Sequence, residues 1–271
     1  MNLPDFLNLF SLPFMQRAVI GGVLLGILGG ILGSFLILRR LSLFGATVGH
    51  SAILGVVLAA LLELPATWTL IGFTVAFGLG VIYLIDRTNL GNDTVLCICM
   101  SGSVALGTIG FSYVKGYRGN LLSILFGDIL TIGNTDLILL SLLLLVTLFW
   151  IIISLPEQIL LTLNRDLALV KGVQVRSYRY FFTVLLAITI AITIRIVGIV
   201  LVNGFLVIPA ASARLICQQF VPFLATAAGI GATSGVIGMI ISGALNLPSG
   251  PSIVLVQLFG FLVVALWCRQ G

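Results

Sequence analysis

Charge is what this sequence has least of. Charged residues make up only 8% of its 271 residues, and there is a single histidine. A soluble domain carries about a quarter charged residues, so this chain lacks the side chains to cover a surface in water. A mean hydropathy of +1.27 and long apolar runs predict an all-α, polytopic integral membrane protein instead. The excess of Lys and Arg (13) over Asp and Glu (8) then indicates loops on the cytoplasmic side, with no nucleic acid as partner.

Two missing motifs narrow the function further. The chain contains no G-x-x-x-x-G-K-[ST] phosphate loop, so it does not hydrolyse ATP by the usual P-loop route. It also contains no H-E-x-x-H motif, which leaves an intramembrane metalloprotease without support. The four cysteines are expected to be buried small hydrophobes, since Cys97 and Cys99 do not share a helix face.

The lengths of the apolar runs predict about eight or nine membrane-spanning helices in one transmembrane domain, residues 1–271. A break near Arg195 and Gly198 divides one long run into two short spans; if it is only a kink, the count is eight. The expected spans are 14–38, 43–62, 66–85, 94–114, 137–155, two between 181 and 216, 221–245 and 253–267.

The first span is unusually rich in glycine. Its stretch GGVLLGILGGILG places glycines four apart at Gly22 and Gly26, at Gly26 and Gly30, and at Gly29 and Gly33. Small residues at this spacing let a second helix backbone approach closely. The pattern predicts tight helix packing and indicates no particular function.

A more polar segment, about 157–178, separates the fifth and sixth spans. Leu163, Leu167 and Val170 follow a helical spacing, Gly172 is a plausible helix stop, and basic residues gather at the end. With nine spans, nine of the 13 basic residues fall on the side of this loop and of the carboxyl terminus. The positive-inside rule therefore places both in the cytoplasm and the amino terminus outside.

Five stretches, taken together and in order, resemble one family. RRLSLFGATVGHSAILGVVLA, LLSILFGDIL, NRDLALVKGV, VGIVLVNGFLVIPAASARLI and LNLPSGPSIVLV are similar to segments of the permease subunits of manganese, zinc and iron ABC importers. The fourth stretch matches closely, through Pro209, Ala210, Ala213 and Arg214. The resemblance covers most of the chain at the right length.

The resemblance implies the permease subunit of an ATP-driven importer for divalent metal ions, with zinc or manganese expected. It implies a homodimer of permease chains in the plasma (inner) membrane, ATP-binding subunits on the cytoplasmic loop, and an external metal-binding protein. The chain itself would be no enzyme and would bind no cofactor, because ATP is used by the partner subunit. Asp166, Ala168 and Gly172 are the positions implied to couple the loop to that subunit.

His50 is the tentative metal ligand, because neutral imidazole binds zinc, manganese and iron. In the resembled family an acidic residue four positions earlier lies on the same helix face, and here that position is Ala46. Gly49 likewise replaces the family's serine. His50 is therefore either a substrate ligand or a hydrogen-bonded structural histidine, and a cation here would lack charge compensation.

Thr47 and Asn203 are further candidates for the pathway or for packing, since polar groups within membranes usually pair across helices. Arg195 is expected near a helix end, where it reaches the interface, and Asp128 is expected in a cap or loop salt bridge. Two other functions stay open. One is an ABC permease for a chelated or non-metal substrate; the other is a secondary transporter or channel without an ATPase, although the spans hold few ionisable residues for an ion relay.

Overall fold

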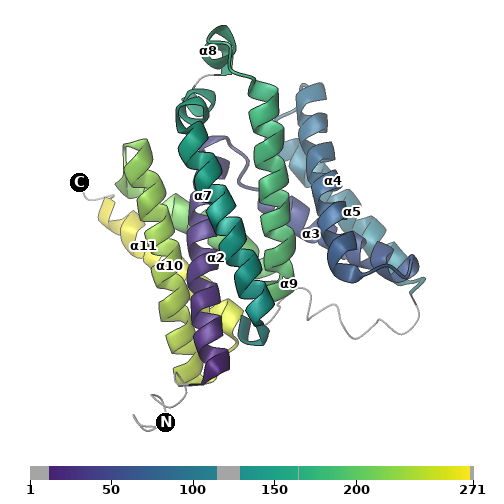
Figure 1. Cartoon of the computed structure of the whole chain (residues 1–271), viewed down its shortest axis with the longest axis vertical. Helices are drawn as coiled ribbons and strands as arrows, with labels where there is room; N and C mark the ends of the chain where they lie inside the picture. The colour runs from purple at the N-terminus through teal and green to yellow at the C-terminus, as the bar shows by residue number, and fades with distance from the viewer. Residues whose placement is uncertain (1–11, 115–128, 164, 269–271) are drawn as a thin grey trace.

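The computed structural model describes residues 12–114, 129–163 and 165–268, and within these ranges the chain is helical without strands. Eight of its helices are long and apolar enough to cross a membrane, within the predicted range of eight or nine. They pack as a bundle of steeply inclined helices (Figure 1). Helices suit a bilayer because they satisfy their backbone hydrogen bonds internally. The predicted FGD stretch with Asp128 lies outside the described residues.

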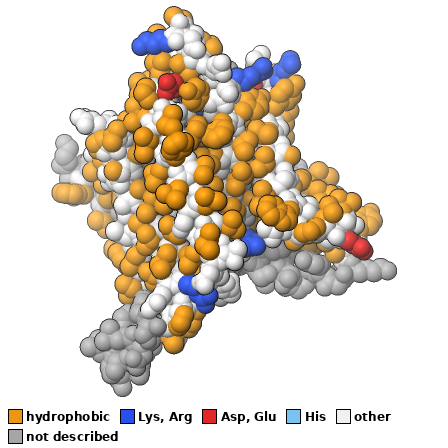
Figure 2. Space-filling model, viewed as in Figure 1, with side chains coloured by type: hydrophobic (Ala, Val, Ile, Leu, Met, Phe, Trp, Pro, Cys, Tyr) orange, Lys and Arg blue, Asp and Glu red, His pale blue; other side chains and the backbone are white. Residues whose placement is uncertain are grey.

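The helix boundaries agree closely with the apolar runs. The elements are α2 (Pro13–Leu38), α3 (Phe44–Leu61), α4 (Ala66–Arg87), α5 (Asn92–Phe111), η1 (Ile129–Thr131), α7 (Asn134–Leu163), α8 (Arg165–Val170), α9 (Val175–Ile216), α10 (Phe220–Leu245) and α11 (Ser249–Cys268). Hydrophobic side chains cover the middle of the face shown in Figure 2, and Lys and Arg lie toward its two ends. This distribution fits a membrane-spanning bundle with polar ends.

Helix α9 contains the predicted break. Gly198 has φ 78° and ψ 169°, a conformation that interrupts the helix and that L side chains rarely adopt. The break separates a full-length span, Val175–Ile199, from a short apolar helix, Leu201–Ile216, which runs back along α2. Just before the break, Arg195 pairs with Asp136 of α7 and donates to Thr67 Oγ1 at 3.2 Å. Arg195 therefore lies near a helix end, as expected.

Helix α7 differs from its prediction. The expected end of this span near residue 155 is wrong, because α7 continues through Pro156 to Leu163. A proline inside a helix removes a single backbone hydrogen bond. Thr162 Oγ1 still donates to Gln158 O at 2.7 Å beyond it. The polar connection between α7 and α9 is consequently shorter than the predicted segment of about 157–178, and α8 occupies most of it.

Helices α2 and α10 cross with their backbones in contact, as the glycine spacing predicted. A Cβ atom placed on Gly26 would lie 2.3 Å from the Gly231 carbonyl carbon, and one on Gly231 would lie 2.2 Å from the Gly26 oxygen. In the same way, a Cβ atom placed on Gly30 would lie 2.4 Å from the Ala227 oxygen. We call this contact the α2–α10 crossing, and it requires glycine on both helices.

The expectation that all four cysteines are buried is wrong, because none of them is fully buried in the structure. Cys97 and Cys268 are exposed, and Cys99 and Cys217 are half-buried. In a membrane protein an exposed apolar side chain on a spanning helix can face lipid, so burial in protein is not needed to remove it from water.

Candidate translocation site

Helix α3 carries His50 and packs on α9 through two glycines one turn apart. A Cβ atom on Gly45 would lie 3.0 Å from Asn203 Oδ1, and one on Gly49 would lie 3.1 Å from Ile199 Cγ2. Ile199 and Asn203 are also one turn apart, just after the break at Gly198. The glycines therefore bring the histidine helix directly against the interrupted part of α9.

His50 is half-buried, and its Nδ1 lies 2.8 Å from the carbonyl oxygen of Ala46. A carbonyl oxygen only accepts hydrogen bonds, so the Nδ1–H donates and Nε2 of the neutral ring keeps its lone pair. This arrangement resembles that of metal-binding histidines, whose second nitrogen donates to a carbonyl or carboxylate. The hydrogen bond from Nδ1 to Ala46 O thus orients the ring against its own helix and leaves Nε2 available to a ligand.

His50 belongs to a half-exposed line of side chains along α3. Ala46, His50, Leu54 and Leu58 follow one another at four-residue spacing, and each is half-buried. The neighbouring faces of α3 are covered by α4, α5 and α9. Over residues 44–55, this line is therefore the face of the helix that the described residues of the chain leave partly open.

Thr47 differs from His50 in exposure, although the two residues lie only three positions apart on α3. Thr47 is fully buried, and its hydroxyl lies 2.9 Å from Leu43 O and 3.2 Å from Leu96 O of α5. Its polar group is satisfied at the α3–α5 contact. Thr47 therefore acts in packing in this structure.

Asn203 presents the opposite case. Its Oδ1 is buried and accepts no hydrogen bond within the described part of the chain. A buried carbonyl oxygen without a partner costs about 1–3 kcal/mol. The oxygen lies over Gly45, on the side of α3 that packs against the interrupted helix. Asn203 thus has a buried acceptor oxygen for which the described residues supply no donor.

No group of three or more His, Cys, Asp or Glu side chains comes together among the described residues. The position four residues before His50, where the resemblance implies an acidic residue, is Ala46, which offers only its backbone oxygen, already bonded to His50. A single histidine does not fill the coordination shell of a divalent ion. A tight, resident metal site is therefore not formed by the described part of one chain.

The predicted coupling positions lie around α8, which projects from one end of the bundle (Figure 1). Asp166 is exposed, whereas Ala168 is fully buried against the chain itself. Gly172 has φ 77° and ends the helix: its N–H donates to Leu169 O and the N–H of Val173 to Ala168 O, both at 3.0 Å. The predicted helix stop is confirmed. Leu163 and Val170 nearby are 77% and 85% exposed, which leaves an apolar surface at this end.

The spanning helices, the interrupted helix and the polar groups along α3 and α9 define a multi-pass membrane transport protein. The sequence model of the ABC 3 transport family matches residues 11–269. The chain belongs to this family, as the five sequence stretches indicated, and is a membrane-embedded transport subunit whose ATPase is a separate chain.

Named relatives agree with this assignment. The chain is 30% identical over 253 residues to the high-affinity zinc uptake system membrane protein ZnuB of Haemophilus influenzae, covering 93% of this chain and 97% of that protein. It is 31% identical over 265 residues to the manganese transport system membrane protein MntC of Listeria innocua, covering 97% and 94%. The structure of PsaBC from Streptococcus pneumoniae in complex with Fab superimposes with a TM-score of 0.83 at 30% identity, covering 97% of this chain and 95% of that one.

Sequence reasoning missed two features of this site. It did not single out Gly45, although the pair Gly45 and Gly49 repeats the four-residue spacing already recognised in the first span. It also missed the surroundings of Arg39, because Phe182 and Gln158, which contact this side chain together with the nearby Phe35, come from distant parts of the sequence.

Proposed function

We propose that this chain is the permease subunit of an ATP-driven importer of divalent metal ions, with zinc or manganese as substrate. Two copies form the pathway between them, ATP-binding subunits dock at α8, and an external binding protein delivers the ion to the opposite end. The observation that carries the proposal is the similarity over nearly the whole chain to relatives named for zinc uptake and for manganese transport.

The distribution of charge supports an orientation in the inner membrane. The end of the bundle that carries α8 bears Arg39, Arg40, Arg87, Lys171, Arg176, Arg179 and Arg214. The opposite end bears Arg17 and Arg195 among the described residues. By the positive-inside rule this excess supports a cytoplasmic location for α8. Cys268 Sγ lies 3.5 Å from Leu215 O, near the end of α9, so the end of α11 is at the same end of the bundle, which supports a cytoplasmic carboxyl terminus.

The line along α3 supports a pathway shared by two chains. His50 is half-exposed there with its Nε2 unengaged, and a symmetric second copy facing it would add a second imidazole. Two weak ligands from two chains suit a transported ion better than a closed cage, because the ion must also leave. No described acidic side chain accompanies the histidine, so water would complete the coordination.

The proposal is tested by transport in the assembled system. Membrane vesicles holding the full complex of permease, ATPase and binding protein are expected to accumulate radiolabelled zinc or manganese only when ATP is present. A complex with an ATPase that is active but moves neither ion would overturn the metal assignment. Transport by the permease without any ATPase would instead favour a secondary transporter.

Replacing Gly172 by alanine is expected to weaken coupling between ATP hydrolysis and uptake severalfold. A Cβ at this position meets no atom within 4 Å, so the change acts through φ 77° alone, which costs a non-glycine residue about 1–2 kcal/mol. The strain falls on the turn that holds α8. The measurement is the number of ions imported per ATP hydrolysed.

Gly91→Ala is the matched control for Gly172→Ala. Gly91 also lies in a connection at this end of the bundle, but its φ of −62° is ordinary for alanine. If the two variants and the parent import the same number of ions per ATP hydrolysed, the turn after α8 has no role in coupling.

A second candidate substrate, a chelated metal, is favoured by Ala46. Loss of the carboxylate leaves a bare dication without charge compensation, whereas a chelate brings its own ligands. The chain is also 31% identical over 258 residues to the chelated iron transport system membrane protein YfeD of Yersinia pestis. This similarity supports a chelated metal as the alternative substrate.

Ala46→Asp distinguishes the two substrates. The carboxylate would lie one turn from His50 and restore the acidic and imidazole pair. If the free ion is the substrate, the concentration of metal needed for half-maximal uptake is expected to fall about tenfold. If the substrate is a chelate, the added charge is expected to impair uptake. Ala46→Asn is the control, because asparagine has nearly the size and shape of aspartate and so separates the effect of charge from that of size.

A further inference from the structure

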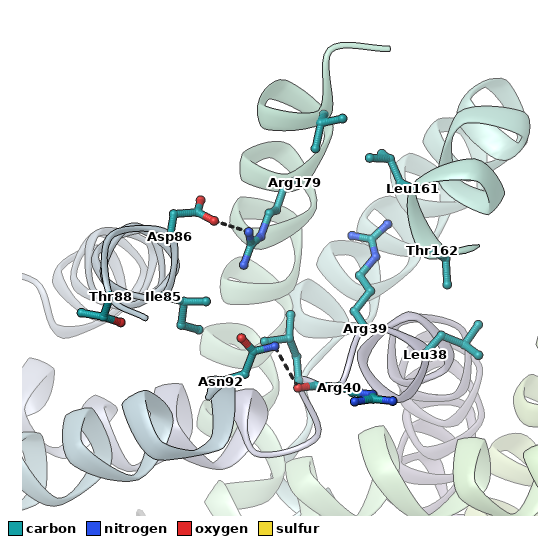
Figure 3. A pocket seen from close by; sticks show the side chains of 12 residues that line it. Leu38, Arg39, Arg40, Ile85, Asp86, Thr88, Asn92, Leu161, Thr162 and Arg179 are labelled. Atoms are coloured by element: carbon teal, nitrogen blue, oxygen red, sulfur yellow. Dashed lines mark hydrogen bonds and ion pairs between the residues drawn. The ribbon is translucent and has the colours of Figure 1, made fainter. Parts of the chain in front are cut away.

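Three arginines line a cavity at the end of the bundle that carries α8. The cavity measures about 560 Å³ and lies where α2, α4, α5, α7 and α9 begin or end. Its charged lining consists of Arg39, Arg40 and Arg179 with the single carboxylate of Asp86 (Figure 3). Three guanidinium groups and one carboxylate give the lining two net positive charges. The proposed transport pathway along α3 uses none of these residues.

Arg39 is the most unusual member of the cavity. Its guanidinium lies over the rings of Phe35 and Phe182, 5.4 and 4.5 Å from their centroids, and donates to the amide oxygen of Gln158. No carboxylate of the described chain pairs with it. Burial, and then repulsion by Arg179, lower the pKa of Arg39 to about 10, so it stays charged at neutral pH. A half-buried cation with only neutral partners among the described residues leaves its charge uncompensated.

The other two arginines face the same space from different segments. Arg179 forms an ion pair with Asp86, and Asp86 is the only acidic side chain among the described residues of the cavity wall. Arg40 follows α2, and its backbone oxygen accepts a bond of 3.4 Å from Asn92 Nδ2. Thr88, Asn92 and Thr162 add neutral polar groups to the wall. The cavity is thus prepared for an anion with several acceptor oxygens.

We propose that this cavity binds a phosphate-bearing anion, held by Arg39 and Arg40, such as the headgroup of an acidic phospholipid. Guanidinium groups bind phosphate oxygens through paired, charge-assisted hydrogen bonds. The cavity lies at the ends of spanning helices, the level at which lipid phosphates are found. Leu38, Leu41, Ile85 and Leu161 in the same wall would contact the glycerol and the first carbons of the acyl chains. The volume fits such a headgroup better than a lone carboxylate.

The test uses the full permease complex, purified in a non-ionic detergent and freed of lipid. Native mass spectrometry would follow the binding of phosphatidylglycerol and of phosphatidylcholine, and thermal unfolding would follow the effect of inorganic phosphate. We expect one tightly held phosphatidylglycerol per permease chain and weaker binding of phosphatidylcholine. Stabilisation by inorganic phosphate alone, lost in Arg39→Gln, would identify a soluble phosphate as the ligand and still support the site.

Arg39→Gln is expected to weaken binding about tenfold or more, and Arg40→Gln severalfold. Arg40 is exposed and contacts no aromatic ring among the described residues, so this second variant keeps the test valid if loss of Arg39 disturbs the packing of Phe35 and Phe182. Arg176→Gln is the matched control: it removes one charge close to Arg179 but does not line the cavity. The proposal is overturned if the parent binds neither probe, or if the cavity variants and the control bind equally.

Discussion

Replacing His50 by alanine is expected to lower ATP-dependent metal uptake at least tenfold, while the complex still assembles. The imidazole is half-exposed, its Nδ1–H is committed to Ala46 O, and Nε2 is left for a ligand. Loss of even a supporting residue of a metal site commonly costs about 10–100-fold in affinity or activity, and here no described acidic residue stands in for the histidine. The measurement is the initial rate of zinc and manganese uptake by vesicles holding the full complex.

Thr47→Ser provides the control for His50→Ala. It changes the same helix three residues away but keeps a hydroxyl that lies within hydrogen-bonding distance of Leu43 O and Leu96 O. Uptake by this variant should stay within about twofold of the parent, since its effect is limited to one buried methyl group. Unchanged uptake in His50→Ala would assign the histidine a purely structural role. Loss of assembly in that variant would lead to the same assignment.

The second large effect is expected at the α2–α10 crossing, where Gly231→Ala should prevent stable folding. The added Cβ would lie 2.2 Å from the Gly26 oxygen, and the obstructing atoms are backbone, which cannot rotate away. Overpacking of this kind costs about 1–3 kcal/mol and occasionally more, and the two helices would have to separate. The measurements are the yield of monodisperse protein in detergent and its unfolding temperature.

Gly229→Ala is the matched control, two residues away on the same helix. A Cβ on Gly229 meets nothing within 4 Å, and alanine is the better helix former. This variant should therefore equal or exceed the parent in stability. Similar behaviour of the two variants would show that α2 and α10 lie farther apart in the membrane than the close contact of Gly26 with Gly231 requires.

The spans were predictable because the bilayer fixes their length and composition. The break at Gly198 was predictable too, because the apolar run around it is too long for one crossing. The end of α7 was not, since Pro156 marks a boundary in most sequences and here interrupts only one backbone bond. Local patterns predict helices well, but they do not show whether tertiary contacts carry a helix past a proline.

The candidate site was only partly predictable. His50 stood out because it is unique, and Gly172 because glycine tolerates the backbone conformation that ends α8. The sequence did not distinguish Thr47 from Asn203, which differ in whether their polar atoms find partners across helices. The cavity around Arg39 is formed by segments far apart in the chain. The spacing of residues within one segment does not predict which other segments it will contact.

The short helix after Gly198 also has a consequence for biosynthesis. Leu201–Ile216 has 16 residues, or roughly 24 Å of helix, less than the hydrocarbon thickness of about 30 Å. It contains Asn203 and Pro209 and ends near Arg214, which further weakens its own partitioning into lipid. Such a segment enters the membrane together with the preceding span, as a helical hairpin. We therefore expect the two helices to insert as one unit that turns at Gly198.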